Sequence, residues 1–396
     1  MPNPIRFRRI IRDKPVGKYI VNDTFTTARA AGTVNNTLAE PGPGRRGVAD
    51  AGSYLSLSSG FLNLSGGGLT DSVLTYDAGL ERRVGIILKW RINSYNNTFV
   101  AGWAPDTVQV GASEYIFPTA TTVNIKAATN LVVSNSPPTP PVVYAMISRA
   151  SGSFHFQNNL LLYISNTLSI PLYIRVYGTS TGDILDYIRV PSERWLPAPL
   201  ISDGFGSTFG TADGEGHAEG VTGGIGAGGA GGAWTNSLGT WTASSGTVAA
   251  TTLSGGIGIA TINSGKSDVY VSAKLTVAGG TNGIIVRYVD NDNFIRLVHN
   301  GTNVQLVKRV ATVETTLVNV AATYVPGAKI ILRVVGQQYR CYYNDTLIGT
   351  EQTISDATFD GVTVVGLRST NTGNTVDDFV AYAVGTGGEH GTLDLF

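Results

Sequence analysis

Short runs in which apolar and polar residues alternate recur along almost the whole chain, and they restrict its fold more than any other feature. Tyr54–Leu57 and Phe61–Leu64 alternate in this way on either side of a Ser58–Gly60 turn. Such alternation is typical of half-buried strands, because successive side chains of a strand point to opposite faces of a sheet. No stretch carries the i, i+3, i+4, i+7 apolar spacing of an amphipathic helix over several turns. The sequence therefore predicts an all-β fold.

Length and composition favour two domains of this kind. The chain has 396 residues, which exceeds the size at which a single core stops growing. Hydrophobic residues make up 42% of it, enough for packed cores, and the frequent Thr, Val, Ile and Tyr residues suit pleated sheets. The single cysteine, Cys341, excludes an intramolecular disulfide, so strand pairing and core burial must hold each domain together.

A repeated opening and closing motif indicates two copies of one two-sheet sandwich. Asp23-Thr24-Phe25 echoes Asp203-Gly204-Phe205, and a glycine precedes both Asp186 and Asp377 by four residues. Prolines stiffen the connection between the copies. The expected parts are a basic arm (1–18), a first sandwich (19–190), a Pro-rich connection (191–200), a second sandwich (201–384) with a Gly-rich loop (210–233), and a tail (385–396).

Charge and hydropathy argue against several classes of partner. The formal net charge is zero, whereas a protein whose main partner is nucleic acid normally carries a basic excess. No apolar run is long enough to span a membrane, and the N-terminus lacks the apolar core of a cleaved signal peptide. If the protein works outside the cell, we expect it to leave by another route, such as assembly into a particle.

Both ends of the chain carry candidate assembly segments. Apolar and basic residues alternate in the N-terminal arm, as they would in a lone strand. This arm is a solvated terminus, a strand added to a neighbouring subunit, or a minor nucleic-acid contact. The apolar C-terminal end docks on a partner or frays. The candidate contact residues are Arg6, Phe7, Arg8, Arg9, Leu395 and Phe396.

The second half of the chain resembles a known superfamily. Gly283–Asp290 leads into Asn293–Arg296 and Gln305–Lys308, between Gly239-Thr240-Trp241 and a closing Asp377-Asp378-Phe379. Over residues 202–384 these motifs resemble the laminin-G-like branch of the concanavalin A-like lectin/glucanase superfamily. The first half departs from the pattern, since it lacks the Arg-Tyr-x-Asp-x-x-Asn run and a match to Trp241. The resemblance implies two tandem jelly-roll β-sandwich domains, and such tandem units with a basic arm are similar to structural proteins of tailed bacteriophages.

The sequence lacks the motifs of an enzyme. Glucanases of this superfamily carry Glu-x-Asp-x-Glu on one strand, which places all three carboxylates on one face, and the chain has no such run. Gly224-x-Gly226-x-x-Gly229 matches a dinucleotide fingerprint by its letters, but no helix follows it. The histidines are scattered without metal-ligand spacing. We therefore expect no catalytic activity.

Calcium is the one cofactor that the sequence leaves open. Asp203 opens the second copy, and Asp377 and Asp378 close it. The first and last strands of a jelly roll often lie side by side, so these carboxylates could share an oxygen site, with Asp23 and Asp186 as the equivalents in the first copy. The alternative is that they accept hydrogen bonds from nearby backbone amides at strand ends.

A ligand site would need exposed aromatic rings beside polar groups. Tyr288, Phe294, Trp103 and Tyr115 are the candidates, and core packing is the alternative for each.

The sequence favours a non-enzymatic virion structural protein, such as a capsid decoration, tail or fibre component. It would contact other copies of itself and other virion proteins, with a host-surface glycan as a further partner. One alternative is a secreted or surface carbohydrate-binding module protein. The other is a glycoside hydrolase, which would need a carboxylate pair in a groove.

Overall fold

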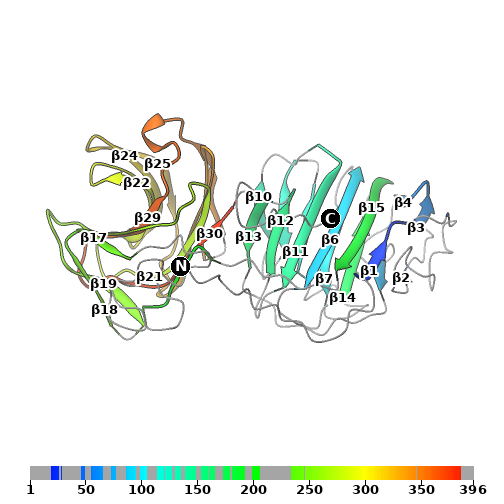
Figure 1. Ribbon diagram of the computed structural model, residues 1–396, viewed down its shortest axis with the longest axis horizontal. Coiled ribbons are helices and arrows are strands. Elements are labelled where there is room, and N and C mark those ends of the chain that lie inside the picture. The colour runs from blue at the N-terminus through cyan, green and yellow to red at the C-terminus, as the bar shows by residue number, and fades with distance from the viewer. Residues whose placement is uncertain are drawn as a thin grey trace, which may run out of the picture. The chain divides into compact units, whose positions relative to one another are not determined.

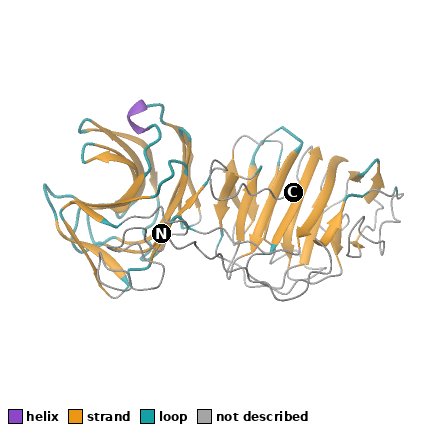
Figure 2. Ribbon diagram, viewed as in Figure 1, coloured by secondary structure: helices purple, strands orange, loops and turns teal. Residues whose placement is uncertain are grey.

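The computed structural model describes both halves of the chain as nearly pure β-structure. The described residues are 19–25, 28, 46–49, 55–65, 73–76, 86–94, 99–104, 114–119, 121–126, 130–134, 139–148, 153–158, 160–165, 173–178, 181–191, 199–205, 233–244, 246–344 and 346–384. They divide into two compact units, the first ending in the described range 181–191 and the second beginning at Pro199. One 3-10 turn, Ala357–Phe359, interrupts the strands of the second unit (Figure 2). The prediction of an all-β fold of jelly-roll sandwiches is confirmed.

The first unit contains two antiparallel sheets. One has the order β13-β12-β11-β6-β15-β4-β3, with β1 added beside β15, and the other has the order β10-β9-β8-β7-β14-β5-β2 (Figure 1). The strands are β1 (Tyr19–Asp23), β2 (Arg46–Ala49), β3 (Leu55–Ser58), β4 (Phe61–Ser65), β5 (Val73–Tyr76), β6 (Ile87–Ser94), β7 (Phe99–Ala104), β8 (Glu114–Pro118), β9 (Val123–Lys126), β10 (Asn130–Ser134), β11 (Val142–Ser148), β12 (Ser153–Gln157), β13 (Leu160–Ile164), β14 (Tyr173–Gly178) and β15 (Thr181–Pro191).

The second unit also contains two antiparallel sheets. Their orders are β18-β19-β30-β21-β26-β27-β28, with β16 beside β30, and β17-β20-β29-β22-β23-β24-β25. The strands are β16 (Ile201–Asp203), β17 (Thr235–Leu238), β18 (Thr240–Ser244), β19 (Thr247–Thr252), β20 (Gly258–Asn263), β21 (Val269–Thr276), β22 (Asn282–Asp290), β23 (Asn293–His299), β24 (Asn303–Val310), β25 (Val313–Ala321), β26 (Ala328–Val335), β27 (Gln338–Tyr343), β28 (Thr346–Thr353), β29 (Val364–Ser369) and β30 (Thr375–Ala383).

The strand order of the second unit is that of the first with every strand number raised by fifteen. The central run β11-β6-β15-β4 of one sheet, for example, corresponds to β26-β21-β30-β19. In each unit the opening strand pairs antiparallel with the closing strand, β1 with β15 and β16 with β30. The repeated Asp-x-Phe motif therefore occupies the same place in both strand orders.

This motif forms the same turn in both units. The Oδ1 atom of Asp23 accepts the backbone N–H of Phe25 at 3.2 Å, and Oδ1 of Asp203 accepts that of Phe205 at 2.8 Å. Both phenylalanines have positive φ, 53° and 51°, and both are completely buried. An aspartate that bonds the backbone two residues ahead stabilises such a turn and offsets the strain of the left-handed conformation.

The closing strands, β15 and β30, share a second repeated feature, an acidic residue near a shift in strand register. Both β15 and the β21–β30 ladder shift register near their acidic residues, as at a β-bulge. At this point Arg91 pairs with Asp186 at 3.1 Å in the first unit, and Lys274 pairs with Asp378 at 2.5 Å in the second. In both units, therefore, an acidic residue of the closing strand forms an ion pair with the neighbouring strand where the register shifts.

The core of the second unit lies between its two sheets. Ile284 and Val286 of β22 face Ile330 and Leu332 of β26 within one apolar cluster. Because strand side chains alternate, the residues between these positions point away from the core. The sheet that contains β22 therefore presents a second face, which carries the candidate site.

Candidate functional site

We define the outer face as the side of the β17-β20-β29-β22-β23-β24-β25 sheet that points away from the core. Ile259, Ile285 and Phe294 form a small apolar cluster there, separate from the main core. Cross-strand pairing places Arg296 beside Ile285 and Val307, and Arg309 beside Phe294 and Glu314. Apolar, aromatic and charged side chains therefore share this one face.

A bulge at Arg287 places the ring of Tyr288 on this face. Arg287 has a φ of 53°, and the pairing of β22 with β23 shifts register between Val286 and Asp290. The Arg287 guanidinium is buried, where it donates to the carbonyls of Gly336 at 3.0 Å and Phe359 at 3.2 Å. With Arg287 anchored inward, the half-buried Tyr288 ring stacks on Phe294 with centroids 6.3 Å apart.

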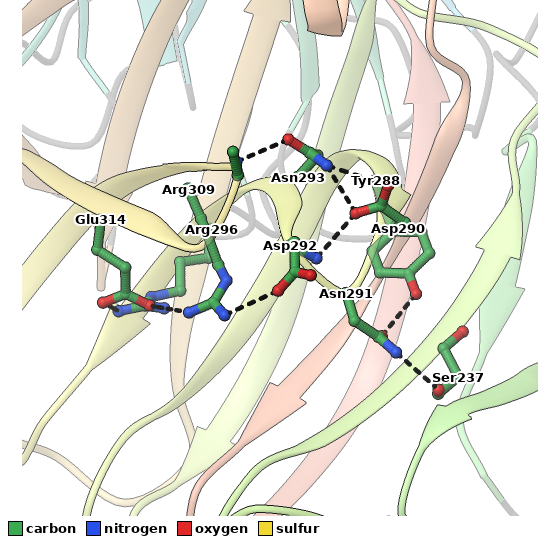
Figure 3. A network of polar contacts seen from close by, with 10 residues as sticks. Ser237, Tyr288, Asp290, Asn291, Asp292, Asn293, Arg296, Arg309 and Glu314 are labelled. Carbon is green, nitrogen blue, oxygen red and sulfur yellow. Dashed lines mark hydrogen bonds and ion pairs between the residues drawn. The ribbon is translucent and has the colours of Figure 1, made fainter.

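Polar side chains of the β22–β23 turn bind one another beside Tyr288 (Figure 3). Asp290 accepts the N–H of Asp292 and an amide proton of Asn293, both at 2.8 Å. The Tyr288 hydroxyl donates to Asn291 Oδ1 at 2.8 Å, and burial raises the pKa of this phenol. The turn thus holds exposed carboxylates and amides in fixed positions beside an aromatic ring.

Arginines extend the polar surface across β23, β24 and β25. Both terminal nitrogens of Arg296 contact the Glu314 carboxylate, the Nη2–Oε2 distance being 2.7 Å. Arg309 also reaches Glu314, at 3.4 Å, and binds Asp292 at 3.0 Å while its guanidinium lies 6.0 Å from the centre of the Phe294 ring. The hydrogen bonds from Arg296 hold the pKa of Glu314 below its usual value. Figure 3 shows this carboxylate beside the two guanidinium groups.

The four aromatic residues that the sequence predicts for a ligand site differ in their exposure. Tyr288 lies on the outer face, and Phe294 is 1% exposed beneath it, so Phe294 supports the Tyr288 ring without being exposed itself. Trp103 is completely buried, and the prediction that it lines a ligand site is wrong because β7 turns this ring into the core. Tyr115 is half-buried and packs edge-on against Phe117 in the first unit.

The three carboxylates proposed for calcium do not form a metal site. Asp203 is 1% exposed, and its two oxygens accept the Phe205 N–H and, at 2.7 Å, the Trp234 indole N–H. Asp378 pairs with Lys274, and Asp377 accepts the N–H of Asp378 at 2.6 Å. Across the described ranges, no three His, Cys, Asp or Glu side chains are grouped to hold a metal ion. The calcium prediction is therefore wrong at these residues, and the alternative of local hydrogen bonding holds for Asp203.

Several predictions concern residues outside the described ranges. These are the N-terminal arm with Arg6, Phe7, Arg8 and Arg9, almost all of the Gly-rich loop, most of the Pro-rich connection, and the tail with Leu395 and Phe396. Within the part of the chain that the structure describes, no helix has the length and apolar character needed to cross a membrane.

The arginines and Glu314 are the site residues that sequence reasoning missed. A signal was present, because Arg296 interrupts the apolar run Phe294–Val298 at a position that strand alternation assigns to one face. Only the pairing of β23 with β24 and β25 brings Arg309 and Glu314 to the same place.

Comparison with known proteins gives structural but no sequence matches. No family model matches the chain, and no curated protein matches it. Among similar solved structures is the carbohydrate-binding module CBM66 from Bacillus subtilis, 16% identical, covering 38% of this chain and 95% of that one, with a TM-score of 0.32. The catalytic domain of an endo-1,3-beta-glucanase from Thermotoga petrophila is 10% identical, with coverages of 44% and 98% and a TM-score of 0.30. A galectin from Caenorhabditis elegans is 11% identical, with coverages of 30% and 84% and a TM-score of 0.24. We therefore infer function from the geometry of the chain itself.

Proposed function

We propose that the protein is a non-enzymatic carbohydrate-binding protein, and that the outer face of its second unit holds the saccharide. The observation that carries this proposal is the Tyr288–Phe294 stack, which lies within a network of carboxylate, amide and guanidinium groups. A sugar ring has an apolar face that packs on an aromatic ring and hydroxyl groups that bond planar polar side chains. The outer face offers both kinds of group side by side.

The internal bonding of the β22–β23 turn supports binding. Asp290 is held by Asn293 and by the backbone of Asp292, and Asn293 in turn accepts the N–H of Ala311 at 3.0 Å. The polar groups are therefore oriented before a ligand arrives, which lowers the entropy lost on binding. Asn319 extends the polar surface, where it accepts hydrogen bonds from Asn303 at 2.8 Å and Gln305 at 3.2 Å.

A glycan array probed with the full chain and two variants tests this function. Tyr288→Ala removes the stacking ring and should lower affinity for any bound glycan by about five- to thirtyfold, in line with about 1–2 kcal/mol for an aromatic contact. Tyr288→Phe keeps the ring and loses only the hydrogen bonds of the hydroxyl group, so it should bind within about threefold of the parent chain, for a loss of under about 0.7 kcal/mol.

Two results would contradict the proposal. One is that the folded parent chain binds no glycan. The other is that Tyr288→Ala binds as tightly as the parent chain.

The virion role predicted from the sequence stays a prediction, because the arm and the tail on which it depends lie outside the described residues. Deleting residues 1–18 should weaken assembly while both sandwiches stay folded, as measured by sedimentation and circular dichroism. Normal assembly of the deletion variant would remove the arm from that hypothesis.

A further inference from the structure

Arg368 is a buried cation on the outer face that the network of Figure 3 does not include. It lies on β29, paired in register with Ile259 on one side and Gly283 on the other. Its side chain is 4% exposed, and its Nη1 atom donates to Thr281 Oγ1 at 2.8 Å. Its Nε–H has no hydrogen-bond partner, and no carboxylate of the described residues forms an ion pair with it.

The carboxylate of Glu314, which acts electrostatically on Arg368, already binds two other cations. Glu314 binds Arg296 through both of its oxygens and also contacts Arg309. Burial, and next the charge of Arg296, lower the pKa of Arg368 to about 9. The guanidinium therefore remains charged at neutral pH, in a place where burial opposes its charge and no carboxylate is paired with it.

Glycines occupy the positions next to this cation. Gly283 stands beside Arg368 across the strand pair, and Gly366 precedes it by two residues on the same face. A Cβ at Gly283 would lie 2.1 Å from the Leu297 carbonyl oxygen, and one at Gly366 would lie 2.2 Å from that of Ala260. Only glycine fits at either position, so no side chain from them covers the guanidinium group.

We propose that Arg368 binds the anionic group, a carboxylate or a sulfate, of an acidic saccharide held on the outer face. This inference rests on the proposed carbohydrate-binding function and names the class of glycan. The planar guanidinium fork matches the paired oxygens of either anion. A neutral saccharide offers hydroxyls but no charge to balance Arg368, so it gains less from this contact.

The test uses an array that carries acidic glycans beside their neutral parents. Uronate oligosaccharides are paired with their methyl esters, and sulfated galactan oligosaccharides with their desulfated forms, so the two pairs distinguish a carboxylate from a sulfate. The full chain should bind the acidic member of one pair about tenfold tighter or more, as expected of a charged hydrogen bond. Arg368→Gln should abolish that preference and leave the affinity for the neutral parent within about twofold, for a change of under 0.5 kcal/mol.

Two further variants keep the result interpretable. Lys274→Gln removes the same charge from the other sheet of the unit and should retain the preference. Glu314→Gln removes the competing carboxylate and should strengthen the binding of the acidic member, which a misfolded variant would not do. Affinity for the neutral parent reports the folding of each variant.

The outcomes distinguish the role of Arg368 from carbohydrate binding as such. Equal binding of acidic and neutral members, or a preference that survives Arg368→Gln, would overturn the role of Arg368 while leaving carbohydrate binding intact. Absence of binding to every glycan by the folded chain would overturn both.

Discussion

Replacing Asp203 with alanine should destabilise the second unit strongly, because this one carboxylate joins three parts of the fold. It ends β16, closes the turn to Phe205, and accepts the indole N–H of Trp234, which precedes β17. The Trp234 ring lies 5.1 Å, centroid to centroid, from Phe379 of the closing strand β30. Losing the carboxylate therefore frees both the turn and the ring.

The magnitude follows from the two hydrogen bonds. Each bond to a buried ionised acceptor contributes about 1.5–3 kcal/mol, and its removal leaves a buried donor unpaired. The two losses share one site and are not additive, so we expect Asp203→Ala to lower the free energy of unfolding by about 3–5 kcal/mol. Asp203→Asn keeps one acceptor but turns an amide donor toward the second N–H, which should lower it by about 1–3 kcal/mol.

Urea unfolding followed by tryptophan fluorescence measures these changes, since Trp234 lies next to the substituted residue. Asp378→Ala is the matched control, because the Asp378 side chain is 54% exposed and its surface ion pair with Lys274 contributes at most about 1 kcal/mol. Calcium should not shift the midpoint of the parent chain. The reasoning is refuted if Asp203→Ala unfolds within about 1 kcal/mol of the parent chain, or if calcium stabilises the parent chain but not the variant.

Two further predictions concern the same unit. His299 is buried, its Nδ1 accepts the N–H of Gly301 at 2.9 Å, and burial lowers its pKa. The unfolded chain therefore takes up a proton near pH 6.5 before the folded chain does, so stability should be constant above that pH and fall as the pH drops below it, toward the lowered pKa of the folded state. Urea midpoints between pH 8 and 5 check this, and an unchanged slope in His299→Gln would contradict the assignment. Gly283→Ala forces a Cβ against the Leu297 carbonyl and should lower the thermal midpoint, with about 1–3 kcal/mol lost.

The Arg-Tyr-x-Asp-x-x-Asn run shows which features of the site could be predicted from the sequence and which could not. Alternation predicts strands on both sides of this run, and its Asp and Asn residues predict a turn. The bulge at Arg287 was not predictable, because the carbonyls of Gly336 and Phe359 that hold its guanidinium come from distant segments. Without that anchor, strand alternation alone would not tell which of Arg287 and Tyr288 faces the outside.

Local patterns in the sequence were sufficient for the class of fold and for the repeated Asp-x-Phe turn, since a period of two and an aspartate that bonds the backbone two residues on are short-range features. The sequence did not determine which aromatic residues are buried, as Trp103 shows, or that Arg296, Arg309 and Arg368 meet on one face. Those outcomes depend on how strands far apart in the chain pair and on which face each sheet turns to its partner. The apolar run Ile284–Val286, buried on both faces, carries no local mark that separates the inner face from the outer one, so only the packing of the second sheet decides it.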